Sequence, residues 1–281
     1  MSQDPAPLGT GTAPLPDRPP SHPLRAAPGR RELALVLGLV FFLNLTLGAG
    51  FQLMSPRLGL LLTEIVFIAL PPIAAVRLFY LAPRAVLPFR RPAARHLVAA
   101  VVGAVSLNHL LEMYGAWQER FAPTPDWIRA LFAGLLEAHS GSEFALVLVC
   151  LAFVPALCEE ILFRGFVQTG VLAQTSRVPV GLLVSALLFG IFHLDPWRLA
   201  GVFVLGLWFG WLRQESGSLW PPIAAHALNN ALSIGLERAG WLSDSHAPGS
   251  ALSVVLAGLG VVLAVALARP RGSRTPFDRM L

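Results

Sequence analysis

Charged residues are scarce in this sequence: Asp, Glu, Lys and Arg make up 13% of its 281 residues, whereas 55% are hydrophobic. A soluble globular domain carries about 25% charged residues, so the composition favours a protein whose main solvent is lipid. Lysine is absent, and all 21 basic residues are arginine. The arginines lie in short stretches between apolar runs, as membrane topology signals do. We therefore expect no nucleic-acid partner.

Cysteine is also rare. Cys150 and Cys158 lie eight residues apart in one apolar run, which corresponds to roughly 12 Å of rise along a helix. A disulfide requires the two Cα atoms to be within about 7 Å. The spacing therefore excludes a disulfide between them on one helix, and we expect two small, buried packing residues.

Long apolar runs are missing from the N-terminal segment, which has eight prolines within residues 1–28. Such a segment cannot bury enough apolar surface to order itself, and we predict a disordered, Pro-rich cytoplasmic tail over residues 1–30. The apolar run after Arg30 and Arg31 is long enough to cross a membrane. It is typical of an uncleaved first transmembrane helix and not of a signal peptide.

The remainder, residues 31–281, is predicted to be a single transmembrane domain with an all-α fold, a polytopic helical bundle of about eight spans. A span needs about 20 apolar residues. The predicted spans are 33–53, 58–80, 96–113, 144–168, 178–194, 198–213, 219–237 and 251–269. Between the third and fourth spans, residues 114–143 mix polar and apolar positions and predict an amphipathic helix at the membrane interface.

Orientation follows from the arginines of the short connections, which concentrate in the N-terminal tail, the 84–95 loop and the C-terminal tail. Cytoplasmic segments of membrane proteins are enriched in basic residues. We expect both termini in the cytoplasm, and the composition favours an integral protein of a bacterial inner membrane.

Two adjacent carboxylates interrupt the fourth span, Glu159 and Glu160, followed by Arg164. An ionisable side chain in a membrane costs at least about 2.5–3.5 kcal/mol, so each needs an explanation. Glu160 and Arg164 are four residues apart with the acid first, which favours an intrahelical ion pair. A purely structural ion pair explains these two residues, but it leaves Glu159, which points about 100° away on the helix, without a partner.

Two histidines occupy later spans. His193 ends the fifth span, and His226 shares a helix face with Asn230 on the seventh. With Glu159 they supply a carboxylate base, two imidazoles and an amide donor, which can activate water and stabilise an oxyanion. Imidazole and carboxylate are also ligands for a metal such as zinc, so a metal site and a metal-independent glutamate mechanism both stay open.

These residues form the motifs Glu-Glu-x-x-x-Arg (159–164), Phe-x-x-x-His (189–193) and His-x-x-x-Asn (226–230). In this ordered set the sequence resembles the CAAX-processing and bacteriocin-processing (CPBP) membrane peptidases, also called the Abi or Rce1-like family. The resemblance covers about residues 145–235, which we take as the catalytic core of a CAAX-endopeptidase-like enzyme, potentially a metallopeptidase.

The resemblance also implies roles for individual residues. Glu159 and His193 would activate water, and His226 and Asn230 would hold the oxyanion or complete a metal site. Glu160, Arg164 and Phe189 would support the site and engage substrate. If a divalent metal such as Zn²⁺ is used, its ligands would be Glu159, His193 and His226. The expected partners are membrane lipids and a membrane-associated or lipidated polypeptide substrate.

A simple arrangement of full spans would separate His193 from Glu159 and His226 in depth. The fifth and sixth segments are short, however, and we expect a tilted hairpin whose tip, residues 194–197, stops within the membrane. Gly206 and Gly210 would allow close packing of its second helix. Glu64, about two turns into the second span, either reaches the central cavity or extends toward the interface.

Two other classes of function compete with a peptidase. Intramembrane Glu and His residues also serve transporters and proton relays, although the three motifs are not repeated along the chain as transporter halves often are. A non-catalytic immunity or scaffold protein on the same fold is the third possibility. Each is distinguished from a peptidase by whether the chain cleaves a peptide through Glu159.

Overall fold

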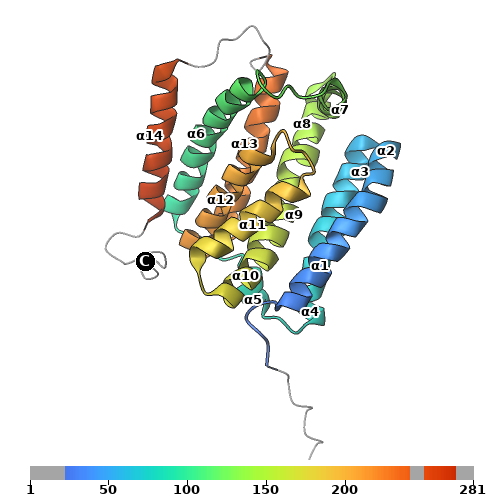
Figure 1. Ribbon diagram of the computed structural model, residues 1–281, viewed down its shortest axis with the longest axis vertical. Coiled ribbons are helices and arrows are strands. Elements are labelled where there is room, and N and C mark those ends of the chain that lie inside the picture. The colour runs from blue at the N-terminus through green and yellow to red at the C-terminus, as the bar shows by residue number, and fades with distance from the viewer. Residues whose placement is uncertain (1–22, 241–249, 270–281) are drawn as a thin grey trace, which may run out of the picture.

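The computed structural model describes residues 23–240 and 250–269, and in these ranges the chain forms helices and no strand (Figure 1). The predicted all-α fold is confirmed. The predictions for residues 1–22, 241–249 and 270–281 concern positions outside the described residues.

Among the described residues, five helices are long and apolar enough to cross a membrane. Three of them are continuous runs of α- and π-helical segments. The first run comprises α1 (Arg30–Leu43), η1 (Asn44–Gly48) and α2 (Ala49–Met54), and the second comprises α3 (Pro56–Leu62), η2 (Thr63–Ala69) and α4 (Leu70–Leu78). The third comprises α8 (Gly141–Leu148), η3 (Val149–Phe153), α9 (Val154–Glu160), η4 (Ile161–Val167) and α10 (Gln168–Thr175). The other two are α6 (Ala94–Gln118) and α14 (Ala251–Ala268).

The remaining helices are shorter or more polar. α11 (Val178–Phe192) is apolar but has 15 residues, fewer than the roughly 17 that a span requires. α12 (Leu199–Ser216) and α13 (Trp220–Arg238) complete the set of eight, so every predicted span coincides with a helix. Short connecting helices are α5 (Pro83–Val86) and α7 (Asp126–Leu136).

Helix α7 corresponds to the amphipathic helix predicted within residues 114–143. Its Ile128 is buried, whereas Trp127 and Leu131 are exposed. The helix is therefore present with one apolar side turned outward, and its location at a membrane interface stays a prediction.

The helices are arranged so that the core of the bundle contains the polar motifs. Figure 1 shows α1–α4 along one flank and α14 along the opposite flank, where α14 packs against α6, while α9, α11, α12 and α13 lie between them. The start of α1 and the end of α14 lie at the same end of the bundle. This arrangement agrees with termini on one side of a membrane, and which side that is stays a prediction.

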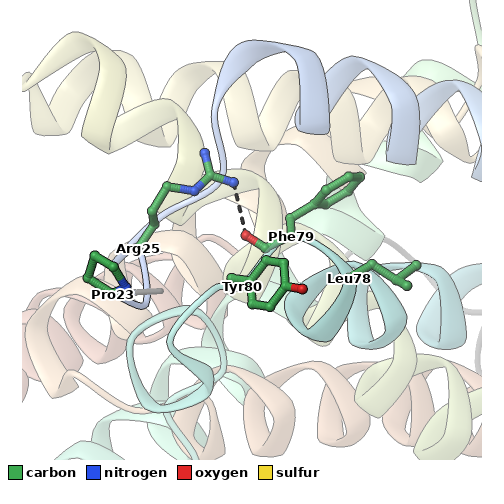
Figure 2. Close-up of a pocket in the computed structure, with 5 residues that line it drawn as sticks. All are labelled: Pro23, Arg25, Leu78, Phe79 and Tyr80. Atoms are coloured by element: carbon green, nitrogen blue, oxygen red, sulfur yellow. Dashed lines mark hydrogen bonds between the residues drawn. The ribbon is translucent and has the colours of Figure 1, made fainter. Parts of the chain in front are cut away.

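Residues 23–29, which the sequence assigns to the tail, contact the bundle. Arg25 pairs with the connection after α4: its backbone N–H donates to Tyr80 O at 3.0 Å, and its O accepts from the backbone N–H of Ala82 at 2.8 Å. Its guanidinium donates to Phe79 O at 3.1 Å and pairs with Glu32 at 2.7 Å. Figure 2 shows Arg25 reaching toward Phe79 beside Tyr80. A backbone pairing and an ion pair therefore attach residues 23–29 to the bundle.

The predicted hairpin of short helices is observed. α11 ends at Phe192 and α12 begins at Leu199, and Figure 1 shows α11 running obliquely across the bundle. A Cβ added at Gly206 of α12 would lie 3.0 Å from the Cβ of Ala186 on α11. Glycine therefore permits the close approach of the two helices, as predicted. The depth of the hairpin tip in a membrane stays a prediction.

Proline contributes to the irregular geometry around the carboxylates. Pro155 is the second residue of α9, which lies between the π-helical segments η3 and η4. A proline has no N–H to donate to the carbonyl four residues earlier, and π-helical turns are frequent at functional sites. The two cysteines of this run are free and buried, as expected.

Candidate active site

Glu160 and Arg164 form a completely buried ion pair on the face of α9 and η4 that packs against the core. The Arg164 Nη1 atom donates to Glu160 Oε1 at 2.8 Å, and both side chains are 0% exposed. The predicted i,i+4 pairing is therefore present. Because both charges lie out of solvent, the pair depends on the further polar contacts described next.

The Arg164 guanidinium is held by α12 and by two aromatic rings. Its Nη2 donates to Gly206 O at 3.0 Å, and its central carbon lies 4.2 Å from the Phe189 ring centroid and 5.3 Å from that of Phe209. One turn later, Gln168 Nε2 donates to Gly210 O at 3.0 Å. Glu160, Arg164 and Gln168 thus form a polar stripe against the glycine face of α12.

His226 on α13 joins the same network. Its Nδ1 lies 3.0 Å from Glu160 Oε1, and its ring stacks on Phe209 with centroids 4.9 Å apart and planes at 17°. An ionised carboxylate can only accept, so Nδ1 carries a proton and donates it to Glu160. The opposite nitrogen, Nε2, then faces Glu159 Oε2 at 4.0 Å.

His193, directly after α11, approaches Glu159 from another direction. Its Nδ1 lies 2.8 Å from Phe189 O, a carbonyl that can only accept, so this nitrogen also carries a proton. Its Nε2 lies 3.9 Å from Glu159 Oε2. The two imidazoles are fixed through Nδ1 by Phe189 O and Glu160, and both direct Nε2 to the same carboxylate.

Glu159, His193 and His226 therefore converge, although they come from three different helical segments. The distances of 3.9 and 4.0 Å show that the short hairpin brings His193 to the same carboxylate as His226. Glu159 Oε2 has no hydrogen-bond partner within the described residues. Atoms about 4 Å apart can each accept a hydrogen bond of about 2.8 Å from one water molecule between them, so the arrangement suits a bound water.

The donor set also has the chemistry of a metal site, since two imidazole nitrogens and a carboxylate oxygen are ligands that zinc accepts. In residues 23–240 and 250–269, however, no group of three or more His, Cys, Asp or Glu side chains is placed to hold a metal ion. The reaction proposed below therefore uses only protein side chains and water, and metal dependence stays a hypothesis for experiment.

Asn230 lies one turn beyond His226, but its amide has a backbone partner. The Nδ2 atom donates to Leu151 O at 3.3 Å, the carbonyl four residues before Pro155. The missing N–H of Pro155 explains why a side-chain donor is useful there. Asn229 accepts from Asn108 Nδ2 on α6 at 3.4 Å. The oxyanion role of Asn230 accordingly stays a prediction.

The sequence did not single out two residues that shape the site. Gln168 continues the spacing of Glu160 and Arg164 by one more turn, so the i,i+4 pattern could have identified it. Phe209, which stacks on His226, lies in a uniformly apolar segment and carries no comparable signal.

Comparison with known proteins finds similarity in the segment of the chain that carries the site. Residues 141–232 match the family described as type II CAAX prenyl endopeptidase Rce1-like. The chain is also similar to the protein described as "Putative membrane peptidase YdiL" from Bacillus subtilis (strain 168), with 31% identity over 85 residues, which is 30% of this chain and 34% of that protein. The chain thus spans about one third of that relative's length. No solved structure matches the chain.

The matched segment contains all the residues of the site described above, from Glu159 to Asn230. The resemblance recognised in the three motifs is thereby confirmed: the segment that carries them, residues 141–232, is similar to the Rce1-like family and to a described membrane peptidase.

Proposed function

We propose that the protein is an intramembrane endopeptidase that hydrolyses a peptide bond in a membrane-associated or lipidated polypeptide. The observation that carries the proposal is the convergence of His193 Nε2 and His226 Nε2 on the unpartnered Oε2 of Glu159, at 3.9 and 4.0 Å. The other polar side chains of the site form hydrogen bonds with Glu160, with Arg164 or with the backbone. Glu159 is the acid that stays free to accept a proton.

In the proposed reaction, a water molecule between Glu159 and His193 is the nucleophile. Glu159 accepts one proton of this water as general base, and His193 Nε2 accepts a hydrogen bond from the other O–H. The water oxygen attacks the carbonyl carbon of the scissile bond, and the carbonyl oxygen becomes an oxyanion. The proton on Glu159 then passes to the leaving nitrogen, and the C–N bond breaks.

His226 is suited to stabilise the oxyanion. When its Nε2 is protonated, it donates a hydrogen bond toward the site, and the positive charge on the ring is balanced by Glu160 at 3.0 Å from Nδ1. The Phe209 ring limits rotation of the imidazole because the two rings are stacked. The buried Glu160–Arg164 pair thus contributes by orienting His226 and not by proton transfer.

The test uses the full chain reconstituted in proteoliposomes with a library of lipidated, membrane-anchored peptides. Cleavage is measured by mass spectrometry for the wild type, Glu159→Ala and His193→Ala, with Glu137→Ala as a control because Glu137 has a side chain that is 63% exposed. We expect cleavage by the wild type and the control and loss of cleavage in the two site variants.

Two results would contradict the proposal or redirect it, and a third would establish a role for a metal. Equal cleavage by the wild type and Glu159→Ala would remove Glu159 as the base. A Glu159-dependent proton flux across the proteoliposome membrane, with no cleavage of any peptide, would favour the proton-relay alternative. Loss of cleavage on chelation, restored by zinc, would establish the metal requirement that the protein geometry leaves to experiment.

A further inference from the structure

Glu64 is a third carboxylate in the interior of the bundle, and the proposed reaction does not use it. It lies in η2 of the second long helix, in the segment Thr63–Ala69. Its side chain is 6% exposed, and its Oε2 atom has no hydrogen-bond partner within the described residues. Of the two positions considered from the sequence, the interior one is observed, because a carboxylate extended toward the interface would be accessible.

The surroundings of Glu64 connect it to the site. η2 packs against α9, and Glu64 interacts electrostatically with Glu159 and with Cys158 of that helix. The neighbouring hydroxyl of Thr63 is already bonded to Gly59 O at 2.8 Å. Two carboxylates with unpartnered oxygens, Glu64 and Glu159, therefore lie on facing segments.

A structural role does not account for this residue. A buried polar group stabilises a fold when it is paired, and it destabilises the fold when it is left unpaired. Among the described residues, Glu64 makes no hydrogen bond and no ion pair, whereas Glu160 has both Arg164 and His226. A leucine would fill the position of Glu64 without that cost, so the presence of a carboxylate there indicates a role in function.

We propose that Glu64 is a positioning residue for Glu159, to which it is bridged by an ordered water molecule. Such a water donates one hydrogen to each carboxylate and satisfies acceptors that otherwise lack partners. The bridge fixes the Glu159 carboxylate with Oε2 facing His193 and His226. This role does not depend on which carboxyl group carries a proton, and it rests on the proposed function of Glu159 as general base.

The experiment compares Glu64→Leu and Glu64→Gln with the wild type in the proteoliposome cleavage assay and in thermal unfolding. Leucine removes all hydrogen bonding, whereas glutamine preserves shape and can still bond a bridging water. We expect Glu64→Leu to lower kcat about tenfold or more, since a misoriented base loses much of its contribution. KM should stay within about twofold, and Tm should be unchanged or higher, because leucine removes the cost of burying a carboxylate. Glu64→Gln should keep kcat within about threefold of the wild type.

Three outcomes would overturn the proposal: wild-type kcat in Glu64→Leu, loss of activity in parallel with a fall in Tm, or a glutamine variant no more active than the leucine variant. Glu159→Ala measured in parallel separates the two levels of inference. If Glu159→Ala retains cleavage, the proposed function itself fails. If Glu159→Ala is inactive while Glu64→Leu cleaves normally, the role of Glu64 alone is wrong.

Discussion

Replacing Arg164 with methionine tests how the buried polar network is held together. Methionine occupies a similar volume but carries no charge, so the substitution leaves the Glu160 carboxylate at 0% exposure with His226 Nδ1, at 3.0 Å, as its remaining partner. The Gly206 carbonyl also loses the donor that lies 3.0 Å away. The network then contains an uncompensated negative charge in the interior of the bundle.

The expected cost is large because the charge cannot reach water. Removing one partner of a buried ion pair destabilises a protein by about 3–5 kcal/mol. For a chain of this size, 1 kcal/mol corresponds to roughly 2–4 °C in Tm, so Arg164→Met should lower Tm by roughly 6–20 °C. An exposed pair provides the matched control: Arg129 pairs with Glu119, and their side chains are 55% and 36% exposed. Arg129→Met should therefore cost at most about 1 kcal/mol.

The assay is thermal unfolding in detergent, followed by the fluorescence of the seven tryptophans. The double variant Glu160→Gln/Arg164→Met removes both charges and should recover much of the lost stability, since a neutral pair avoids the unpaired charge. A Tm for Arg164→Met equal to that of Arg129→Met would refute the reasoning. A double variant less stable than Arg164→Met would refute it as well, because the penalty would not arise from Glu160.

Two further substitutions test the packing around the site. Gly206→Val should destabilise the protein by about 1–3 kcal/mol, because an added Cβ lies 3.0 Å from the Cβ of Ala186. The control is Gly258→Ala, which should leave Tm unchanged because no atom lies within 4 Å of its added Cβ. Equal Tm values for the two variants would contradict the close α11–α12 packing. Asn230→Ala should cost about 1–3 kcal/mol by removing the donor to Leu151 O, and it should cost less in a Pro155→Ala background, where a backbone N–H becomes available. Equal costs of Asn230→Ala in the two backgrounds, measured by thermal unfolding, would show that the missing N–H of Pro155 is not the reason for the contact.

Much of the fold could be predicted because lipid imposes a simple rule: a span must be long and apolar. Every predicted span coincides with a helix, and five helices of the described residues, α14 (Ala251–Ala268) among them, meet this rule of length and composition. The rule does not resolve where α-helix gives way to π-helix. The turns of η3 and η4 on either side of Glu159 and Glu160 depend on local packing and on the single proline at position 155.

The site itself was predictable to the extent that its residues are costly in a membrane. Glu159, His193 and His226 stand out in an apolar sequence, and the i,i+4 spacing identifies Glu160 and Arg164 as a pair. Tertiary packing decides the rest. The stacking of Phe209 on His226 is invisible in sequence because phenylalanine is ordinary in a transmembrane helix.

The contacts of residues 23–29 with the bundle were also not predictable from the sequence. Residues 23–29 have the composition of a flexible segment, yet the pairing of Arg25 with Tyr80 and Ala82 holds them against the bundle. A contact between segments more than fifty residues apart has no signature in local composition.

The central claim is that two adjacent glutamates have separate roles, with Glu159 accepting the proton and Glu160 holding His226 and Arg164. The direct test is to measure kcat and Tm for Glu159→Gln and Glu160→Gln under the same conditions. We predict that Glu159→Gln lowers kcat by about a hundredfold or more with an unchanged Tm, because its Oε2 has no hydrogen-bond partner to lose among the side chains and backbone of the described residues. Glu160→Gln should lower both kcat and Tm, since it leaves Arg164 unpaired. Normal cleavage by Glu159→Gln, or a loss of stability in it as large as that of Glu160→Gln, would contradict this division of roles.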